Sequence, residues 1–264
     1  MNNGGRTILV TGATGTVGSE VVKQLKPLVQ SVGTAVHLQY KADKFKGDRA
    51  VEIVNIDYNK QETIVGALYN VDKLFLVTLP TPNMTEVSSN LVKEAKKNDV
   101  GFVVKLSVMG ANAKPGTIIG RLHRQEEKII EESGIPYTFL RPTSFMQNFL
   151  NFFGQTIKNQ NAFYLPTRDG KVSFVDVRDI AAVAVNVLTK NRSQHENKAY
   201  DITGRETLSF SQAAEILSKD IGKRESYIDI PEEDARKGMK TMGMENWFID
   251  AMMEFNNIRA GHGS

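Results

Sequence analysis

Apolar residues occur along the chain in two patterns, as short continuous runs and as longer stretches with a helical period. A run from Thr7 to Val10 precedes apolar residues that recur at helical spacing between Val17 and Leu28. This order predicts a buried strand and then an amphipathic helix. The same pattern predicts further strands at 34–40, 51–55, 73–78, 102–107 and 136–140. It predicts further helices at 60–69, 85–98, 118–133, 144–158 and 176–190.

The alternation of strands and helices predicts the fold class. Strands separated by helices form a parallel sheet that is covered on both faces. We therefore expect an α/β protein with a doubly wound parallel sheet, the Rossmann fold. No internal repeat or Pro/Gly-rich linker divides the chain, so 1–264 is expected to be a single domain. Residues 142–170 and 203–264 are expected to add a small, mostly helical C-terminal substrate lobe.

Three glycines separate the first predicted strand from its helix, in the order Gly12-x-x-Gly15-x-x-Gly18. The first allows a sharp turn, the second lets the backbone approach a pyrophosphate, and the third lets the helix pack against the strand. The helix N-terminus adds free N–H groups and the positive end of the helix dipole. The motif predicts an NAD(P)-binding domain. The cofactor contacts expected here come from Gly12, Thr14, Gly15, Thr16, Val17 and Gly18.

The segment after the second predicted strand bears on the choice of cofactor. NAD-binding sites usually place an acidic residue about 20 positions past the glycines, where it holds the ribose 2′-hydroxyl. Residues 37–41 contain no acid, and Lys41 and Lys44 offer positive charge where a 2′-phosphate would lie. The sequence favours NADPH, with NADH as a possible cofactor. The alternative is an ordinary solvated basic turn.

Two copies of Tyr-x-x-x-Lys, the acid–base pair of many short-chain dehydrogenases, occur at 40–44 and 69–73. Tyr40 follows the second predicted strand, at the edge that meets the adenosine ribose. Tyr69 precedes the fourth predicted strand, at the end away from the ligand. Proton transfer needs hydrogen-bond reach to the reacting atom, so we interpret both copies as chance matches.

Composition narrows the function further. The net charge of +3 is spread along the chain without a basic block, which argues against a nucleic-acid partner. The chain has no cysteine, which suits a reducing cytoplasm. The four histidines are scattered, so no metal site is expected. A polar N-terminus and the lack of a long apolar run predict neither a signal peptide nor a membrane partner.

Six segments of the chain carry a family resemblance: VTGATGTVG (10–18), VNIDYNK (54–60), LFLVTLPTP (74–82), VVKLSVMGA (103–111), ESGIPYTFLRPTSFMQNF (132–149) and VSFVDVRDIA (172–181). On these segments the chain resembles atypical short-chain dehydrogenases/reductases of the NmrA-like group. That group includes triphenylmethane-dye reductases, a quinone oxidoreductase, azoreductases and non-catalytic NADP sensors. The resemblance covers nearly the whole chain, and GIPYTFLRPTSFMQNF is its most specific segment.

The resemblance implies further cofactor residues. Asp57 and Tyr58 follow the third predicted strand and are expected to line the adenine. Thr78, Leu79 and Pro80 follow the fourth and are expected to pass beside the ribose and nicotinamide. These positions agree with the general rule that ligands bind at the carboxyl ends of the strands.

The resemblance also implies what borders the nicotinamide. Pro142 to Phe145 follow the sixth predicted strand, and Ser107 ends the fifth, where the wider superfamily keeps a catalytic serine. The helix after the fifth strand lacks the catalytic tyrosine. His123 occupies the corresponding position and is a candidate proton donor, with Glu127 four residues further on. A polar pocket residue is the alternative for His123, and a backbone-satisfying hydroxyl for Ser107.

Hydride acceptors that are already electrophilic do not require a strong protein acid, because water can supply the proton. The protein then contributes proximity and stacking. Phe145, Met146, Phe149 and Tyr164 are candidate substrate residues, although aromatic residues at helical spacing also form cores. The resulting hypothesis is an NADPH-dependent reductase of a quinone-like, azo or other conjugated aromatic acceptor.

Two alternatives remain open from the sequence. One is a non-catalytic NADP(H)-sensing regulatory protein, which the missing Tyr/Lys pair favours. The other, weaker alternative is a nucleotide-sugar epimerase-like enzyme. The resemblance implies a monomer or weak homodimer. It also implies that relatives continue past a segment like Arg259-Ala260-Gly261, so a C-terminal continuation is expected.

Overall fold

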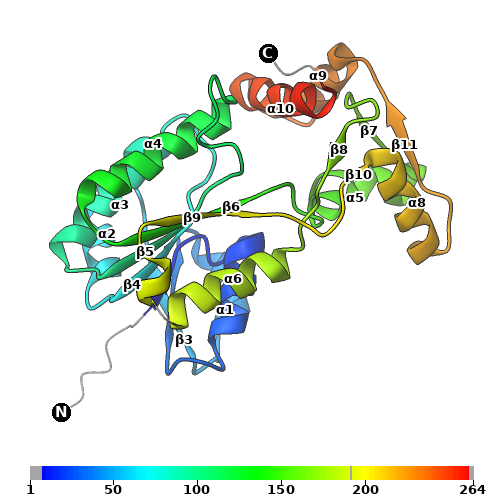
Figure 1. Ribbon diagram of the computed structural model, residues 1–264. Coiled ribbons are helices and arrows are strands. Elements are labelled where there is room, and N and C mark those ends of the chain that lie inside the picture. Colours follow the sequence, from blue (N-terminus) through cyan, green and yellow to red (C-terminus); the bar gives the residue numbers. More distant parts are fainter. Residues whose placement is uncertain (1–7, 191, 262–264) are drawn as a thin grey trace.

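The computed structural model describes residues 8–190 and 192–261, and its centre is a seven-stranded sheet (Figure 1). Thr7, where the first predicted strand begins, lies outside the described residues. All neighbouring strands of this sheet run parallel, in the order β3-β2-β1-β4-β5-β6-β9. The strands are β1 (Ile8–Val10), β2 (Val32–Val36), β3 (Val51–Asn55), β4 (Lys73–Leu76), β5 (Phe102–Leu106), β6 (Tyr137–Pro142) and β9 (Lys198–Ile202).

Helices cover both faces of the sheet, as the doubly wound fold requires. On one face α1 packs beside α6, and on the other α2, α3 and α4 lie side by side (Figure 1). The helices of the first face are α1 (Thr16–Leu25), α6 (Val177–Thr189) and the short α7 (Arg192–His195) that follows α6. Those of the second are α2 (Gln61–Leu68), α3 (Met84–Lys97) and α4 (Ile118–Ser133). One buried apolar cluster fills the space under each layer.

The predicted elements and the observed ones differ at several ends. The strand predicted at 34–40 ends at Val36, and a 3₁₀ helix, η1 (Gln39–Phe45), follows it. The helix predicted to reach Leu28 ends at Leu25, and Leu28 is 58% exposed. Strand β9 was not predicted, because at this edge of the sheet its side chains are mostly exposed and carry no apolar run.

The second part of the structure is a lobe beyond one end of the sheet. It contains short strands where the sequence analysis predicted none. Two small two-stranded sheets, β10 with β8 and β11 with β7, pack with helices around a third apolar cluster. The elements are α5 (Asn148–Gln160), β7 (Ala162–Leu165), β8 (Lys171–Val172), β10 (Leu208–Ser209), α8 (Phe210–Ile221), β11 (Ser226–Asp229), α9 (Glu232–Thr241) and α10 (Asn246–Arg259). The lobe is mostly helical, as expected, and the two small sheets add short strands that were not predicted.

The glycine turn fixes how α1 meets the sheet. Gly12 has φ of +60°, a conformation that costs glycine little. A Cβ on Gly18 would lie 2.2 Å from the carbonyl oxygen of Gly12. The first turn of α1 therefore sits directly on the loop that leaves β1, and only a hydrogen at position 18 permits this.

We predict that Gly18→Ala destabilises the protein by roughly 1–3 kcal/mol, because the methyl group meets backbone that cannot rotate away. Urea denaturation would measure the loss, and a nicotinamide-fluorescence titration would detect weaker NADPH binding. Gly238→Ala in α9 is the matched control, because a Cβ there has no atom within 4 Å. Equal stability of the two variants would contradict the argument.

Candidate functional site

The glycine turn forms a cradle at the N-terminus of α1. Gly15 is the N-cap residue, and no side chain caps the helix. A Cβ on Gly15 would meet only the carbonyl oxygen of Gly12, at 3.2 Å, so this side of the loop is open to a ligand. Thr14 is partly exposed and Thr16 exposed, whereas Val17 is buried in the core. Uncapped N–H groups beside an open glycine backbone fit the pyrophosphate of a dinucleotide.

The adenine end lies past the carboxyl ends of β2 and β3. Lys44 donates to the backbone oxygen of Thr14 at 3.0 Å, and burial together with the charge of Lys41 lowers the pKa of Lys44. His37 and Tyr58 stack with ring centroids 6.2 Å apart, and burial raises the pKa of Tyr58 to about 12. Lys44 and Tyr58 thus lie past the carboxyl ends of β2 and β3, and their contacts with a 2′-phosphate and adenine stay predictions.

Asp57 is already occupied within its own turn. Its carboxylate accepts from the Asn59 N–H at 3.0 Å and lies 3.8 Å from the Lys60 ammonium. Its contact with adenine stays a prediction. The lysine of the first Tyr-x-x-x-Lys copy, Lys44, reaches the glycine turn, whereas the tyrosines of both copies lie at the surface. Tyr40 and Tyr69 are both exposed, and Lys73 donates to the Leu188 backbone on the α6 side.

The direction of winding reverses between β1 and β4, and Thr11 holds these two strand ends together. The Thr11 hydroxyl donates to the Val77 carbonyl at 2.9 Å and accepts from the Val77 N–H at 2.7 Å. Such a reversal creates the crevice in which dinucleotides bind in this class of fold. Leu79 and Pro80 follow directly and are exposed at this edge, where Leu79 keeps 74% of its surface accessible.

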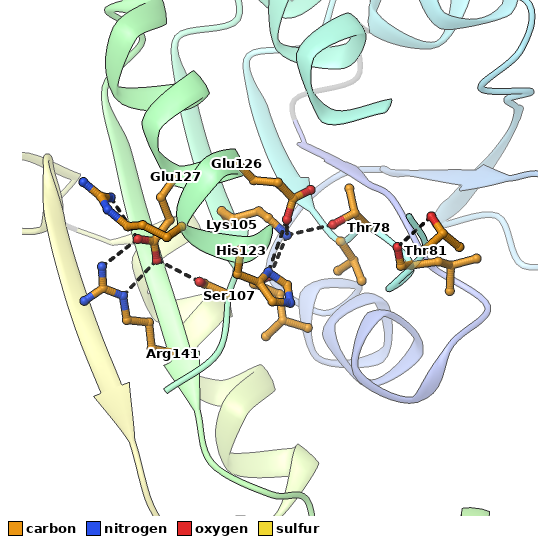
Figure 2. Close-up of polar contacts among 12 residues, drawn as sticks. Thr78, Thr81, Lys105, Ser107, His123, Glu126, Glu127 and Arg141 are labelled. Carbon is orange, nitrogen blue, oxygen red and sulfur yellow. Dashed lines mark hydrogen bonds and ion pairs between the residues drawn. The ribbon is translucent and has the colours of Figure 1, made fainter. Parts of the chain in front are cut away.

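A buried lysine joins the crevice to α4. Lys105 on β5 has no exposed surface. Its ammonium donates to Thr78 Oγ1 at 2.9 Å and to the Leu106 carbonyl at 2.7 Å, and it pairs with Glu126 Oε2 at 3.0 Å (Figure 2). The ammonium thus makes two hydrogen bonds and one ion pair, and one of the hydrogen bonds goes to the loop predicted to pass beside the nicotinamide.

Glu126 connects this lysine to His123. The Nδ1 atom of His123 lies 3.2 Å from Glu126 Oε2, and the His123 side chain is 12% exposed (Figure 2). Burial raises the pKa of Glu126, but Lys105 and His123 outweigh it, so the carboxyl stays ionised. The 3.2 Å separation is an ion-pair distance without hydrogen-bond geometry, and it places the Glu126 carboxylate beside the Nδ1 side of the ring.

Burial is also the main cause of the pKa shifts of Lys105 and His123. It lowers the pKa of Lys105, with Glu126 acting in the opposite direction. It lowers the pKa of His123, and the nearby Lys105 charge lowers it further. A neutral imidazole is therefore the main form of His123 near pH 7.

Ser107 belongs to a second buried network on the same helix. Its hydroxyl donates to Glu127 Oε1 at 2.7 Å, and Glu127 also receives a forked pair from Arg141 at 2.8 and 2.7 Å (Figure 2). Arg124 adds a contact of 3.0 Å. Because the Ser107 proton is directed at Glu127, this hydroxyl can accept from a substrate but is poorly placed to donate.

The segment after β6 runs from the crevice into the lobe. Pro142 ends β6 and accepts from the Met109 N–H at 3.0 Å, and Phe145 forms a bridge with Val175. Met146 is exposed. The Phe149 ring packs among other rings of the third cluster, Phe153, Phe163, Phe174 and Phe210. Tyr164 donates to Gln160 at 2.8 Å. Phe149 thus has a core role, and a substrate role for these four residues stays a prediction.

Residues 5–262 match the NmrA-like family. The chain belongs to this family. It is 39% identical over 247 residues to the NAD(P)H azoreductase of Xenophilus azovorans, covering 94% of this chain and 85% of the relative. Among solved structures it is similar to the Citrobacter sp. triphenylmethane reductase complexed with NADP(H), with a TM-score of 0.83 at 27% identity, covering 97% and 90% of the two chains. The NADPH-dependent quinone oxidoreductase of Escherichia coli, complexed with NADPH, gives a TM-score of 0.83 at 26% identity over 98% and 91%.

The sequence of this NmrA-like protein did not lead us to Lys105 and Arg141, the basic partners of the two buried glutamates. Lys105 stands inside an otherwise apolar strand, FVVKL, and this interruption was a readable signal. Arg141 similarly follows the apolar run of β6. Glu126 and Glu127 lie in a helix rich in charge, where nothing local distinguishes a buried carboxylate from an exposed one.

Across residues 8–190 and 192–261, no helix is both long and apolar enough to cross a membrane. Within the same residues, no three His, Asp or Glu side chains gather as a set of metal ligands.

We expect Lys105→Met to destabilise this NmrA-like protein by roughly 3–5 kcal/mol, because it leaves Glu126 buried without its cation. The double variant Lys105→Met/Glu126→Gln should recover much of that loss, which a urea-denaturation double-mutant cycle would measure. Lys97→Met is the control, since its pair with Glu94 is more than half exposed on the lysine side and contributes about 1 kcal/mol or less. A double variant as unstable as the sum of the single ones would refute the coupling.

Proposed function

We propose that the protein is an NADPH-dependent reductase that transfers hydride to a quinone-like, azo or other conjugated aromatic acceptor. The observation that carries this proposal is the open glycine cradle beside Thr11, which bonds Val77; the next residue, Thr78, is linked through Lys105 and Glu126 to His123. The names of the similar azoreductase, quinone oxidoreductase and triphenylmethane reductase support the acceptor class. Bound NADPH would supply the hydride, and the chain would bind and orient both reactants.

The cofactor proposed is NADPH, with NADH as a weaker ligand. Lys41 is exposed, and Lys44 reaches back to Thr14 at the glycine turn, so both ammonium groups stand near the cradle. A ribose 2′-phosphate is dianionic near neutral pH and gains from such charges. The residues proposed to hold the remainder of the cofactor are those of the glycine turn, Asp57, Tyr58, Thr78, Leu79, Pro80, Pro142 and Phe145.

His123 is the proposed proton donor. Glu126 lies beside its Nδ1, so Nε2 is the ring nitrogen proposed to meet an acceptor atom that gains negative charge as hydride arrives. The imidazolium form donates a proton from Nε2, and the neutral form can only accept a hydrogen bond there. Ser107 would accept a hydrogen bond from the substrate rather than protonate it. A solvent proton can replace His123 for the most electrophilic acceptors.

We also propose that the protein works in the cytoplasm as a monomer or weak homodimer, without a nucleic-acid or membrane partner. The absence of cysteine and the dispersed charge support this placement. The competing hypothesis, an NADP(H) sensor without turnover, is favoured by the missing catalytic tyrosine.

We predict that purified protein oxidises NADPH when menadione or an azo dye is added, seen as falling absorbance of the reduced nicotinamide. Lys41→Ala/Lys44→Ala should weaken NADPH binding by roughly tenfold, because each exposed charge contributes on the order of 0.5–1 kcal/mol. NADH binding should change little. Lys158→Ala/Lys219→Ala, at exposed positions of α5 and α8, is the control that removes the same number of charges. Tight NADPH binding without turnover across quinones and dyes would favour the sensor.

His123 gives a pH-dependent prediction. Because its pKa is lowered, the donating form should disappear as pH rises through a value below the ordinary 6.5 or so. For an azo acceptor, kcat should therefore fall with rising pH on the acid side of neutrality. His123→Gln should remove this limb and lower kcat at pH 5.5 by roughly tenfold or more, with unchanged NADPH affinity. An unchanged pH profile in the variant would exclude His123 as the donor.

A further inference from the structure

An open groove of about 440 Å³ lies between the loop that follows β4 and the turn that joins α9 to α10. Pro80, Pro82 and Asn83 form one wall, and Met244, Trp247 and Phe248 form the other. Its volume falls within the range of small-molecule sites in proteins. None of the residues predicted from the sequence to hold the substrate lines it.

The walls suit a flat aromatic ligand. Two prolines make the first wall stiff, and the second carries two aromatic rings whose centroids lie 5.7 Å apart at 75°. Met244 adds a flexible apolar side chain that adapts to an aromatic edge. Trp247 and Phe248 remain partly exposed, so their apolar surface is available to a ligand.

The groove begins two residues beyond Thr78, on the loop that follows β4. Thr78 accepts from Lys105, and the same loop continues through Pro80 to Thr81 at the groove (Figure 2). The opposite wall is held over α4, because Glu254 of α10 accepts from the Ile118 N–H at the start of that helix. Arg236 of α9 also pairs with Asp250 of α10 at 2.6 Å. A ligand in the groove would therefore lie beside the edge of β4 that is predicted to meet the nicotinamide.

Charge in the groove has one sign. Glu245 is the charged residue of its lining, and its carboxylate accepts from Trp247 Nε1 at 2.8 Å. The residues that line the groove include no lysine, arginine or histidine. A sulfonate or carboxylate on the ligand would find no cation here and would meet a carboxylate instead.

We infer that this groove is the acceptor subsite, and that it takes planar aromatic acceptors that are neutral or cationic and discriminates against anionic ones. The inference rests on the proposed reductase function, because the bound ligand is a hydride acceptor only if the protein is a reductase. Trp247 and Phe248 would stack on the ligand, while the Glu245 carboxylate would disfavour ligands that carry a negative charge.

The test uses the one tryptophan of the chain as a reporter. With NADP⁺ bound, so that no reduction occurs, Trp247 emission is titrated with 4-(dimethylamino)azobenzene and with methyl orange, which differ by one sulfonate. We expect the neutral dye to quench with a Kd at least tenfold lower than that of methyl orange. Glu245→Gln should bring the two values closer together.

Variants locate the binding event, since a dye can quench a tryptophan from a distance. Phe248→Leu keeps apolar volume but removes the ring, and should raise the Kd of the neutral dye by roughly two- to tenfold. Ile258→Ala is the control, an exposed apolar residue on the same helix outside the groove. Equal affinity for the two dyes, or an unchanged Kd in Phe248→Leu, would overturn the inference.

Turnover separates the two proposals. If the neutral dye binds with this variant pattern but NADPH is not oxidised, the groove binds aromatic ligands and the reductase function fails. If dyes are reduced but Phe248→Leu and Glu245→Gln leave the Kd and KM unchanged, the reductase function is supported and the acceptor binds elsewhere.

Discussion

The close contact between the first turn of α1 and the Gly12 carbonyl is the constraint on which the site depends. It can exist only because position 18 lacks a side chain, and it brings the uncapped helix N-terminus over the end of β1. Thr11 then fixes the neighbouring end of β4 by exchanging two hydrogen bonds with Val77. Once these two strand ends are locked, the crevice and the loop from Thr78 onward have a fixed position.

The buried charges of α4 extend this rigid frame toward the chemistry. Two consecutive glutamates reach two neighbouring strands, Glu126 to Lys105 on β5 and Glu127 to Arg141 on β6. Replacing such pairs by apolar residues often costs little stability, so their presence suggests a role other than holding the helix. In this protein the Lys105–Glu126 pair places a carboxylate 3.2 Å from His123 Nδ1, and Glu127, which is paired with Arg141, accepts the Ser107 hydroxyl proton.

The lobe divides its aromatic residues between two tasks. Those on α5, β7 and α8 pack mainly against one another in the third cluster, with Phe149 among them, and hold the small sheets together. Those at the start of α10 stay partly exposed and face the loop after β4. The same residue types therefore stabilise one part of the lobe and offer a binding surface in another.

The sequence by itself determined the parallel sheet, the places of its first six strands along the chain and the glycine turn. Those features follow from local signals, namely apolar periodicity and glycines whose spacing has one structural meaning. It did not determine β9, whose exposed edge carries no apolar pattern, nor which glutamates of α4 are buried. It also did not locate the groove of Trp247, which joins residues about 160 positions apart in the chain. Tertiary structure decided these features, because burial, ion pairing and pocket shape arise from residues that only folding brings together.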